Sequence, residues 1–209
     1  MLNNKGFDLW ADGYDKAVGL SDEENSYPFA GYKEILARIY ETILKKGKST
    51  VLDIGFGTGT LTKRLYEQGC EIWGQDFSSR MIELASAKMP NAHLFQGDFS
   101  QGLVEPLLNN TYDFIIATYS LHHLTDDNKI ALIQSMTDLL KEDGVILIGD
   151  VAFANRADLV QCRREVGDEW DDDEIYFVFD EMQKLLPNLK FQQISYCAGI
   201  LSLARYNIG

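Results

Sequence analysis

The sequence predicts an α/β domain built on a doubly wound, mostly parallel sheet of seven strands, of which the last is antiparallel to its neighbour. Short apolar runs alternate with helical patterns from residue 51 onward, and such alternation requires a parallel sheet with right-handed crossovers. A glycine-rich turn stands between the first strand and the next helix. Only Cys197-Ala198-Gly199 separates the last two strands, which permits a hairpin but no helical crossover.

The first half of the chain supplies the first three strands and the helices around them. Residues 32–46 are expected to form a helix because Ile35, Ile39 and Ile43 recur at helical spacing and Gly47 ends the pattern. The alternation then continues with a strand at 51–54, a helix at 60–68 closed by glycine, a strand at 71–75, a helix at 79–88 ended by proline, and a strand at 93–96.

The second half supplies the remaining strands. Residues 112–118 are almost entirely apolar, which suits a strand buried on both faces. A helix at 127–140 follows the cap-like Thr125-Asp126 and ends near Gly144. The later elements are a strand at 145–149, a helical region at 154–184 with an irregular acidic middle, and strands at 191–196 and 200–206.

Composition limits the partners of this domain. The formal net charge of −13 disfavours nucleic acids and anionic membrane surfaces, because both attract basic proteins. Three widely spaced cysteines lack metal-ligand spacing and are expected to be buried free thiols. Neither a signal peptide nor an apolar run of membrane-spanning length is recognised, so a cytoplasmic location is expected. The oligomeric state stays open.

The most informative motif is VLDIGFGTG at residues 51–59, which places Gly55, Gly57 and Gly59 after Asp53. The order strand, glycine turn, helix brings the backbone against a nucleoside-type ligand. A dinucleotide fingerprint needs glycine or alanine at its sixth position, where this chain has Thr60. The alternative is a turn whose glycines serve geometry alone.

The G-x-G-x-G pattern after Asp53 and the closing hairpin resemble the class I S-adenosylmethionine-dependent methyltransferases, whose fold is Rossmann-like. The resemblance extends from about Tyr32 to the C-terminus. The phrases FDLWADGYD, PFAGYKEIL and SYCAGILSLARYN further resemble the small YrrT-like group of bacterial methyltransferases. The resemblance implies one domain over 1–209, with a lid and helix at 1–46, a cofactor-binding core at 47–153 and a substrate side at 154–209.

The resemblance also implies how the strand ends bind S-adenosylmethionine. Asp53 orients the glycine loop towards the cofactor amine or, equally, braces the turn. Asp76, about twenty residues after the first glycine, binds the ribose hydroxyls, with a helix N-cap as its alternative. The other expected cofactor contacts are Phe77, Met81 (adenine or core), Asp98 (adenine amino group), Phe99 (its N–H to a ring nitrogen), Tyr119 and Tyr14.

The acceptor side is less determined. His122 and His123 follow the fourth strand and supply either a general base or structural hydrogen bonds. Asp150 is a second polar contact, and Tyr14 with Trp10 forms an aromatic lid or a hydrophobic anchor. The acidic run from Asp168 to Glu174 is interpreted as a solvated loop, and no metal is expected.

These expectations favour methyl transfer from S-adenosylmethionine to a small-molecule acceptor. The Asn/Asp-Pro-Pro-Tyr motif of methyltransferases that act on amines of bases or glutamine is absent, which disfavours macromolecular amine substrates. Two alternatives remain: an NAD-dependent oxidoreductase, against which Thr60 and the closing hairpin argue, and a non-catalytic module that senses S-adenosylmethionine.

Overall fold

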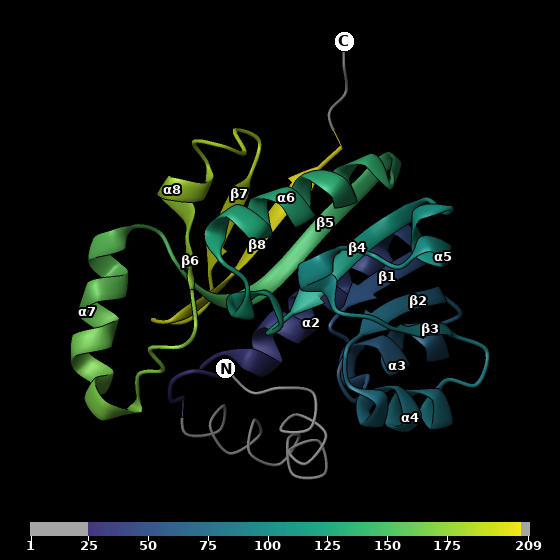
Figure 1. Cartoon of the computed structure of the whole chain (residues 1–209), viewed down its shortest axis with the longest axis horizontal. Helices are drawn as coiled ribbons and strands as arrows, with labels where there is room; N and C mark the ends of the chain where they lie inside the picture. The colour runs from purple at the N-terminus through teal and green to yellow at the C-terminus, as the bar shows by residue number, and fades with distance from the viewer. Residues whose placement is uncertain (1–24, 206–209) are drawn as a thin grey trace.

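A computed structural model describes residues 25–205 and shows one central β-sheet with helices on both faces (Figure 1). Seven strands follow the order β3-β2-β1-β4-β5-β8-β7, and a short β6 pairs with β5 beside this path. The expected fold class is therefore confirmed. Strand order reverses between β1 and β4, and in open α/β sheets ligands bind at that point, beyond the carboxyl ends of the strands.

The elements follow the predicted alternation. The strands are β1 (Thr50–Ile54), β2 (Glu71–Asp76), β3 (His93–Gln96), β4 (Tyr112–Thr118), β5 (Leu140–Phe153), β6 (Phe177–Val178), β7 (Lys190–Gln193) and β8 (Ala198–Ala204). The helices are α2 (Tyr32–Lys46), α3 (Thr60–Glu67), α4 (Ser79–Lys88), α5 (Glu105–Leu108), α6 (Asp126–Asp138), α7 (Arg156–Val166) and α8 (Phe179–Met182).

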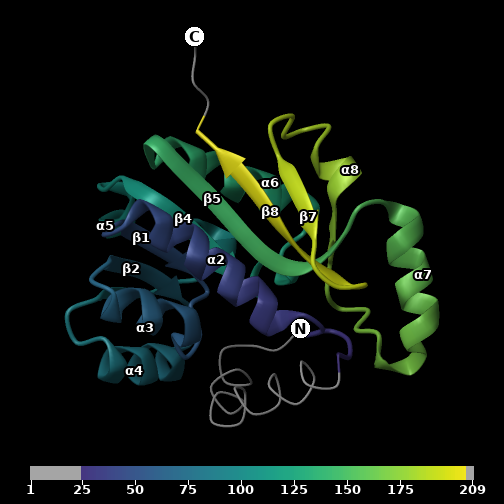
Figure 2. The same ribbon diagram turned by 180° about the vertical axis from the view of Figure 1, so that it is seen from behind.

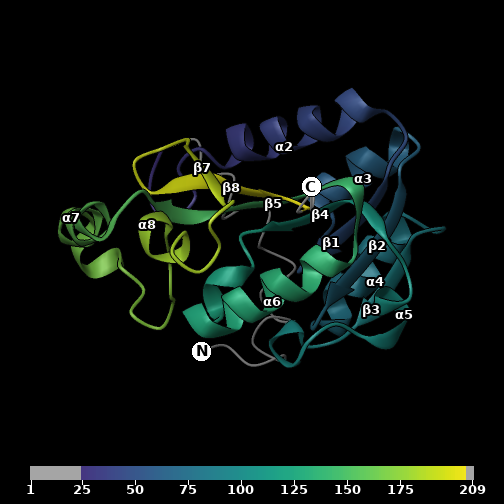
Figure 3. The same ribbon diagram turned by 90° about the horizontal axis from the view of Figure 1, so that it is seen from above.

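The sheet separates two hydrophobic clusters. Successive residues of a strand point to opposite faces, so Val51 joins the cluster under α2, α3 and α4, whereas Leu52 joins the cluster under α5, α6 and α8. Seen from above, α2 and α3 lie on one side of the sheet and α6 on the other (Figure 3). Seen from behind, α2 crosses the sheet diagonally (Figure 2) and contacts β5 and β8.

The C-terminal hairpin closes the sheet as predicted. β8 pairs antiparallel with both β5 and β7, and its register with β5 runs from Ala198 opposite Val151 to Ala204 opposite Val145. The connection differs from the expectation, because β7 ends at Gln193 and the link spans residues 194–197.

The region 154–184 is less helical than the sequence suggested. α7 is followed by a short 3-10 turn, and the apolar residues Phe177 and Val178 form β6, which pairs in parallel with Ala152 and Phe153. α5 and β6 were not predicted, because neither is long enough to show a periodic pattern of apolar residues. Every helix within residues 25–205 is too short or too polar to cross a bilayer.

Candidate active site

The glycine loop lies where strand order reverses. Gly55, Gly57 and Gly59 all have positive φ, at 70°, 56° and 76°, a region that glycine adopts without strain. A Cβ on Gly55 would lie 2.5 Å from the Cβ of Ser120, so this glycine allows the loop to pack against the end of β4. A Cβ on Gly57 would meet no atom within 4 Å, and Gly57 lines a cavity.

Asp76 joins this loop to the end of β2. Its Oδ2 accepts a hydrogen bond from the Gly57 N–H and its Oδ1 accepts one from the Ser78 N–H, both at 2.9 Å. The N-cap of α4 is Ser78, whose hydroxyl accepts from the Met81 N–H at 3.2 Å. Asp76 therefore braces the loop and leaves the capping of α4 to its neighbour, and its buried carboxylate lines the cavity.

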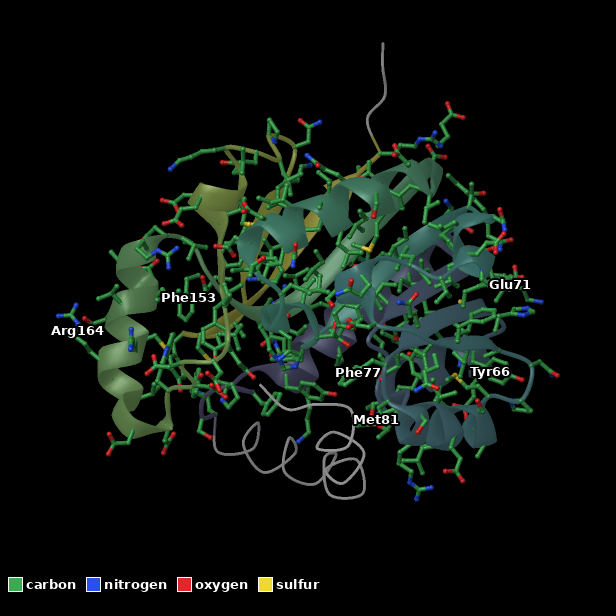
Figure 4. The ribbon with its side chains drawn as sticks, viewed as in Figure 1. Tyr66, Glu71, Phe77, Met81, Phe153 and Arg164 are labelled. Carbon is green, nitrogen blue, oxygen red and sulfur yellow. The ribbon has the colours of Figure 1, made fainter. Side chains whose placement is uncertain are left out.

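The cavity has a volume of about 390 Å³ and brings most of the predicted cofactor residues together. Phe77 and Met81 lie near each other at the start of α4, at the end of β2 opposite Glu71 (Figure 4). The predicted residues that line the cavity are Gly55, Gly57, Asp76, Phe77, Met81, Phe99, Tyr119, His122 and His123.

Three predicted residues lie beside the cavity lining, and one lies outside the described chain. Gly59 is the N-cap of α3 and packs near Met89. Asp98 is exposed and its Oδ1 accepts from the Ser100 N–H at 2.9 Å, capping a 3-10 turn. Asp53 is buried below the loop. Tyr14, like Trp10, lies outside residues 25–205.

The carboxyl group of Asp53 is only half satisfied. Its Oδ2 accepts the Thr62 hydroxyl, whereas its Oδ1 has no hydrogen-bond partner within residues 25–205. The pKa of Asp53 is raised to about 7, mainly by burial; the Thr62 hydrogen bond opposes the shift and the charge of the nearby Asp76 adds to it. A buried carboxyl of this kind is stabilised by a donor or a cation near the loop.

The cavity lining also includes a histidine, His122, held between two carboxyl groups. His122 Nδ1 donates to Asp150 Oδ1 at 2.6 Å, and its Nε2 lies 3.5 Å from Glu174 Oε1. Burial lowers the pKa of His122, but the charge and hydrogen bond of Asp150 outweigh burial, so that the pKa is raised overall. His123 lies beside it, and burial together with the charge of His122 lowers its pKa to about 3.

Asp150 has a different role from the one expected. It is fully buried and outside the cavity lining, and its carboxylate accepts the Leu121 N–H at 3.2 Å and the Val151 N–H at 2.8 Å besides His122. Asp150, near the end of β5, thus positions the 3-10 turn Leu121–His123, named here the histidine turn, rather than contacting substrate.

Most of the acidic run is exposed, as expected of a solvated loop, but part of it reaches the cavity. Glu169, Asp171 and Glu174 line the cavity, and the Tyr176 hydroxyl donates to Glu174 Oε2 at 2.9 Å. Burial raises the pKa of Glu174, with His122 opposing the shift. The sequence signal for this placement was the apolar run that follows Glu174. This run contains the strand β6, which is part of the sheet and so places Glu174 near the interior.

A buried lysine holds this segment against the histidine turn. The Ile175 N–H donates to the His122 carbonyl at 2.8 Å, and Lys129 Nζ donates to the Ile175 carbonyl at 2.5 Å. Lys129 also pairs with Asp126 at 3.0 Å and lies 4.8 Å above the centre of the Phe177 ring. Sequence reasoning missed Lys129, because one lysine on a helix is typical of a solvated face.

Sequence comparisons identify the family. Residues 51–144 match the family described as "Methyltransferase domain". A protein described as an uncharacterised methyltransferase from Anoxybacillus flavithermus is 40% identical over 150 residues, which cover 72% of this chain and 68% of that protein. This chain belongs to the class I S-adenosylmethionine-dependent methyltransferases.

Solved structures share the fold of this methyltransferase. Magnesium protoporphyrin IX methyltransferase from Synechocystis PCC 6803 with bound S-adenosylhomocysteine has a TM-score of 0.66 at 19% identity, covering 85% of each chain. The protein DhpI in complex with S-adenosylhomocysteine has a TM-score of 0.68 at 18% identity, covering 99% of this chain and 96% of that one.

The residues of this methyltransferase fit its cofactor, S-adenosylmethionine. Gly57 leaves space in which a side chain would project from the loop, and the half-satisfied Asp53 suits a cofactor amine. A carboxylate has about four acceptor positions, and two of those on Asp76 receive the backbone N–H groups of Gly57 and Ser78. Vicinal ribose hydroxyls are suitable donors to the same group.

Proposed function

We propose that this methyltransferase acts on a small-molecule acceptor that binds in the same cavity as the cofactor. The observation that carries the proposal is one cavity that is lined both by the glycine loop and by the His122–Glu174 pair, and the part around this pair is named the acceptor end. When bound, S-adenosylmethionine supplies the methyl group. The chain's own residues bind and orient the two reactants and exclude water.

The residues near the glycine loop hold the cofactor in this proposal. Asp76 accepts hydrogen bonds from the ribose, and the backbone at Gly57 permits close approach. Phe77, Met81 and Phe99 contact the base, because each lines the cavity next to Asp76. The roles of Asp53, Gly59, Asp98, Tyr119 and Tyr14 in cofactor binding stay predictions.

The acceptor end favours a small molecule over a nucleic acid. An aromatic cluster lies beside it: Tyr27, which lines the cavity, stacks on Trp170 with ring centres 5.4 Å apart, and both rings contact Tyr176. The acidic residues Glu169 and Asp171 also line the cavity, which disfavours a polyanion. The similar enzyme from Synechocystis is likewise named for a small-molecule acceptor.

Alignment in an enclosed site is the main contribution of the protein. Holding an acceptor atom in line with the methyl group removes entropy before reaction, an effect of about 7–11 kcal/mol in well-oriented cases. The histidine turn lies at the acceptor end of the cavity, where it contacts the acceptor or orients a group that does. A base is needed only for an acceptor that arrives protonated.

The test is transfer of label from methyl-labelled S-adenosylmethionine. The protein is incubated separately with a metabolite extract, total RNA and total protein, with Asp76→Asn as the cofactor-site control. We expect labelled small molecules with the native chain and much less label with the variant. Label found only in RNA or protein would overturn the proposal, as would S-adenosylhomocysteine binding without turnover in any extract.

Three narrower assignments belong with this proposal. The phrases quoted from the two ends of the chain support membership of the YrrT-like group. The three cysteines are free and buried, as predicted, which supports a reducing cytoplasmic location. The division into a lid at 1–46, a cofactor core at 47–153 and a substrate side at 154–209 stays a prediction, as does the aromatic lid formed by Tyr14.

A further inference from the structure

Three side chains at the acceptor end have the composition and spacing of a metal site. One ligand atom from each of His122, His123 and Glu174 lies within 4.8 Å of the other two. The Nε2 of His122 and the Oε1 of Glu174 are 3.5 Å apart. Ligand atoms about 2.0–2.2 Å from a common zinc ion lie at roughly this separation from each other.

Two of these side chains are oriented by a neighbour of the kind that metal ligands use. Asp150 lies 2.6 Å from His122 Nδ1 and so directs Nε2 towards the cavity. The Tyr176 hydroxyl donates to Glu174 Oε2, which directs Oε1 towards the same point. Carboxylate–histidine pairs and hydrogen-bonded carboxylates of this type fix the orientation and basicity of metal ligands.

We propose that His122, His123 and Glu174 bind a divalent transition-metal cation of the Zn²⁺ type at the acceptor end of the cavity. Two imidazoles with one carboxylate suit such cations, whereas Mg²⁺ and Ca²⁺ prefer all-oxygen sites. Three protein ligands leave a coordination position for water or substrate, as in catalytic zinc sites. This assignment departs from the metal-free site that the sequence suggested.

The ion pairs alone do not account for the charges at this end. Asp150 and Glu174 flank the His122 imidazole. Among the cavity-lining residues that the structure describes, Asp76, Glu169, Asp171 and Glu174 are acidic and none is lysine or arginine. A divalent cation compensates this excess directly. Its ability to hold a donor atom of the acceptor rests on the proposed methyl transfer, but binding of the cation rests only on these side chains.

The experiment titrates chelator-treated full-length protein with Zn²⁺ by calorimetry at neutral pH and records the visible spectrum of the Co²⁺-substituted protein. We expect one Zn²⁺ per chain and a Co²⁺ spectrum of nitrogen and oxygen ligation. Glu174→Gln and His123→Gln, which remove single ligands, should each weaken binding at least ten-fold. Tyr176→Phe, which removes an orienting hydroxyl, should weaken it about ten-fold. The exposed His93→Gln and Glu142→Gln are matched controls and should bind as the native chain does.

The proposal is overturned if the native chain binds no stoichiometric Zn²⁺. Equal affinity in the ligand variants and in the controls, or a Co²⁺ spectrum with thiolate bands from the cysteines, would also overturn it. S-adenosylhomocysteine affinity is measured on the same samples. Loss of cation binding with unchanged S-adenosylhomocysteine affinity supports the site, whereas a native chain that binds Zn²⁺ but no S-adenosylhomocysteine contradicts the proposed function alone.

Discussion

Replacing Asp76 with asparagine should weaken binding of S-adenosylhomocysteine about 10- to 150-fold. The substitution keeps the size of the side chain and one acceptor oxygen, but its new NH₂ group cannot accept from both the ribose and the backbone. A hydrogen bond to a charged group contributes about 1.5–3 kcal/mol, and each 1.4 kcal/mol changes the dissociation constant ten-fold. Isothermal titration gives the dissociation constant.

Stability must be separated from affinity in this experiment, because Asp76 also accepts the backbone N–H groups of Gly57 and Ser78. Ser78→Ala is the matched control, since it removes the hydroxyl that caps α4 and should cost about 1 kcal/mol of stability without touching the ribose. The reasoning is refuted if Asp76→Asn lowers the melting temperature as Ser78→Ala does while both bind S-adenosylhomocysteine like the native chain.

Three further predictions test other parts of the structure. The raised pKa of Asp53 means that the folded chain binds an extra proton between about pH 4 and 7. The free energy of unfolding of the native chain should therefore fall by up to about 4 kcal/mol as the pH rises from about 4 to 7. Urea unfolding of Asp53→Asn should lack this fall. Gly57→Ala and Gly47→Ala should each lower the free energy of unfolding by about 1–2 kcal/mol, because φ is 56° and 86° at these positions. Only Gly57→Ala should weaken S-adenosylhomocysteine binding more than ten-fold, as measured by isothermal titration. Lys129→Met should cost about 1–3 kcal/mol by leaving the Ile175 carbonyl without its donor, and it should speed amide hydrogen exchange at residues 175–178; unchanged exchange would contradict this role.

The fold was predictable because its signals are local. The stripe of Ile35, Ile39 and Ile43 predicted α2 with its observed bounds, and the apolar run at 112–118 predicted β4. The predicted ends of helices and strands were wrong where strand pairing between distant residues determined them. α6 ends at Asp138, because Leu140 pairs with Tyr112 and so begins β5 two residues later.

The cofactor half of the site was predictable for a related reason. Parallel strands end at one edge of the sheet, so a carboxylate and a glycine loop that follow different strands must meet there. Asp76 and Gly57 do so, with a hydrogen bond between them. Asp98 follows β3, the outermost strand at that side, and its exposed carboxylate caps a turn.

The acceptor half depends on contacts that no local pattern reveals. Glu174 belongs to an acidic run that resembles a solvated loop, and it reaches the cavity only because the next residue, Ile175, is tied to the His122 carbonyl and to Lys129. Those ties join segments 46 and more residues apart in the chain. The sheet therefore fixes the positions of the glycine loop and Asp76, whereas one loop held by these hydrogen bonds supplies Glu174 to the acceptor end. In the proposed function, the chemistry of the acceptor can then change through the loop, while the residues proposed to hold the cofactor stay in place.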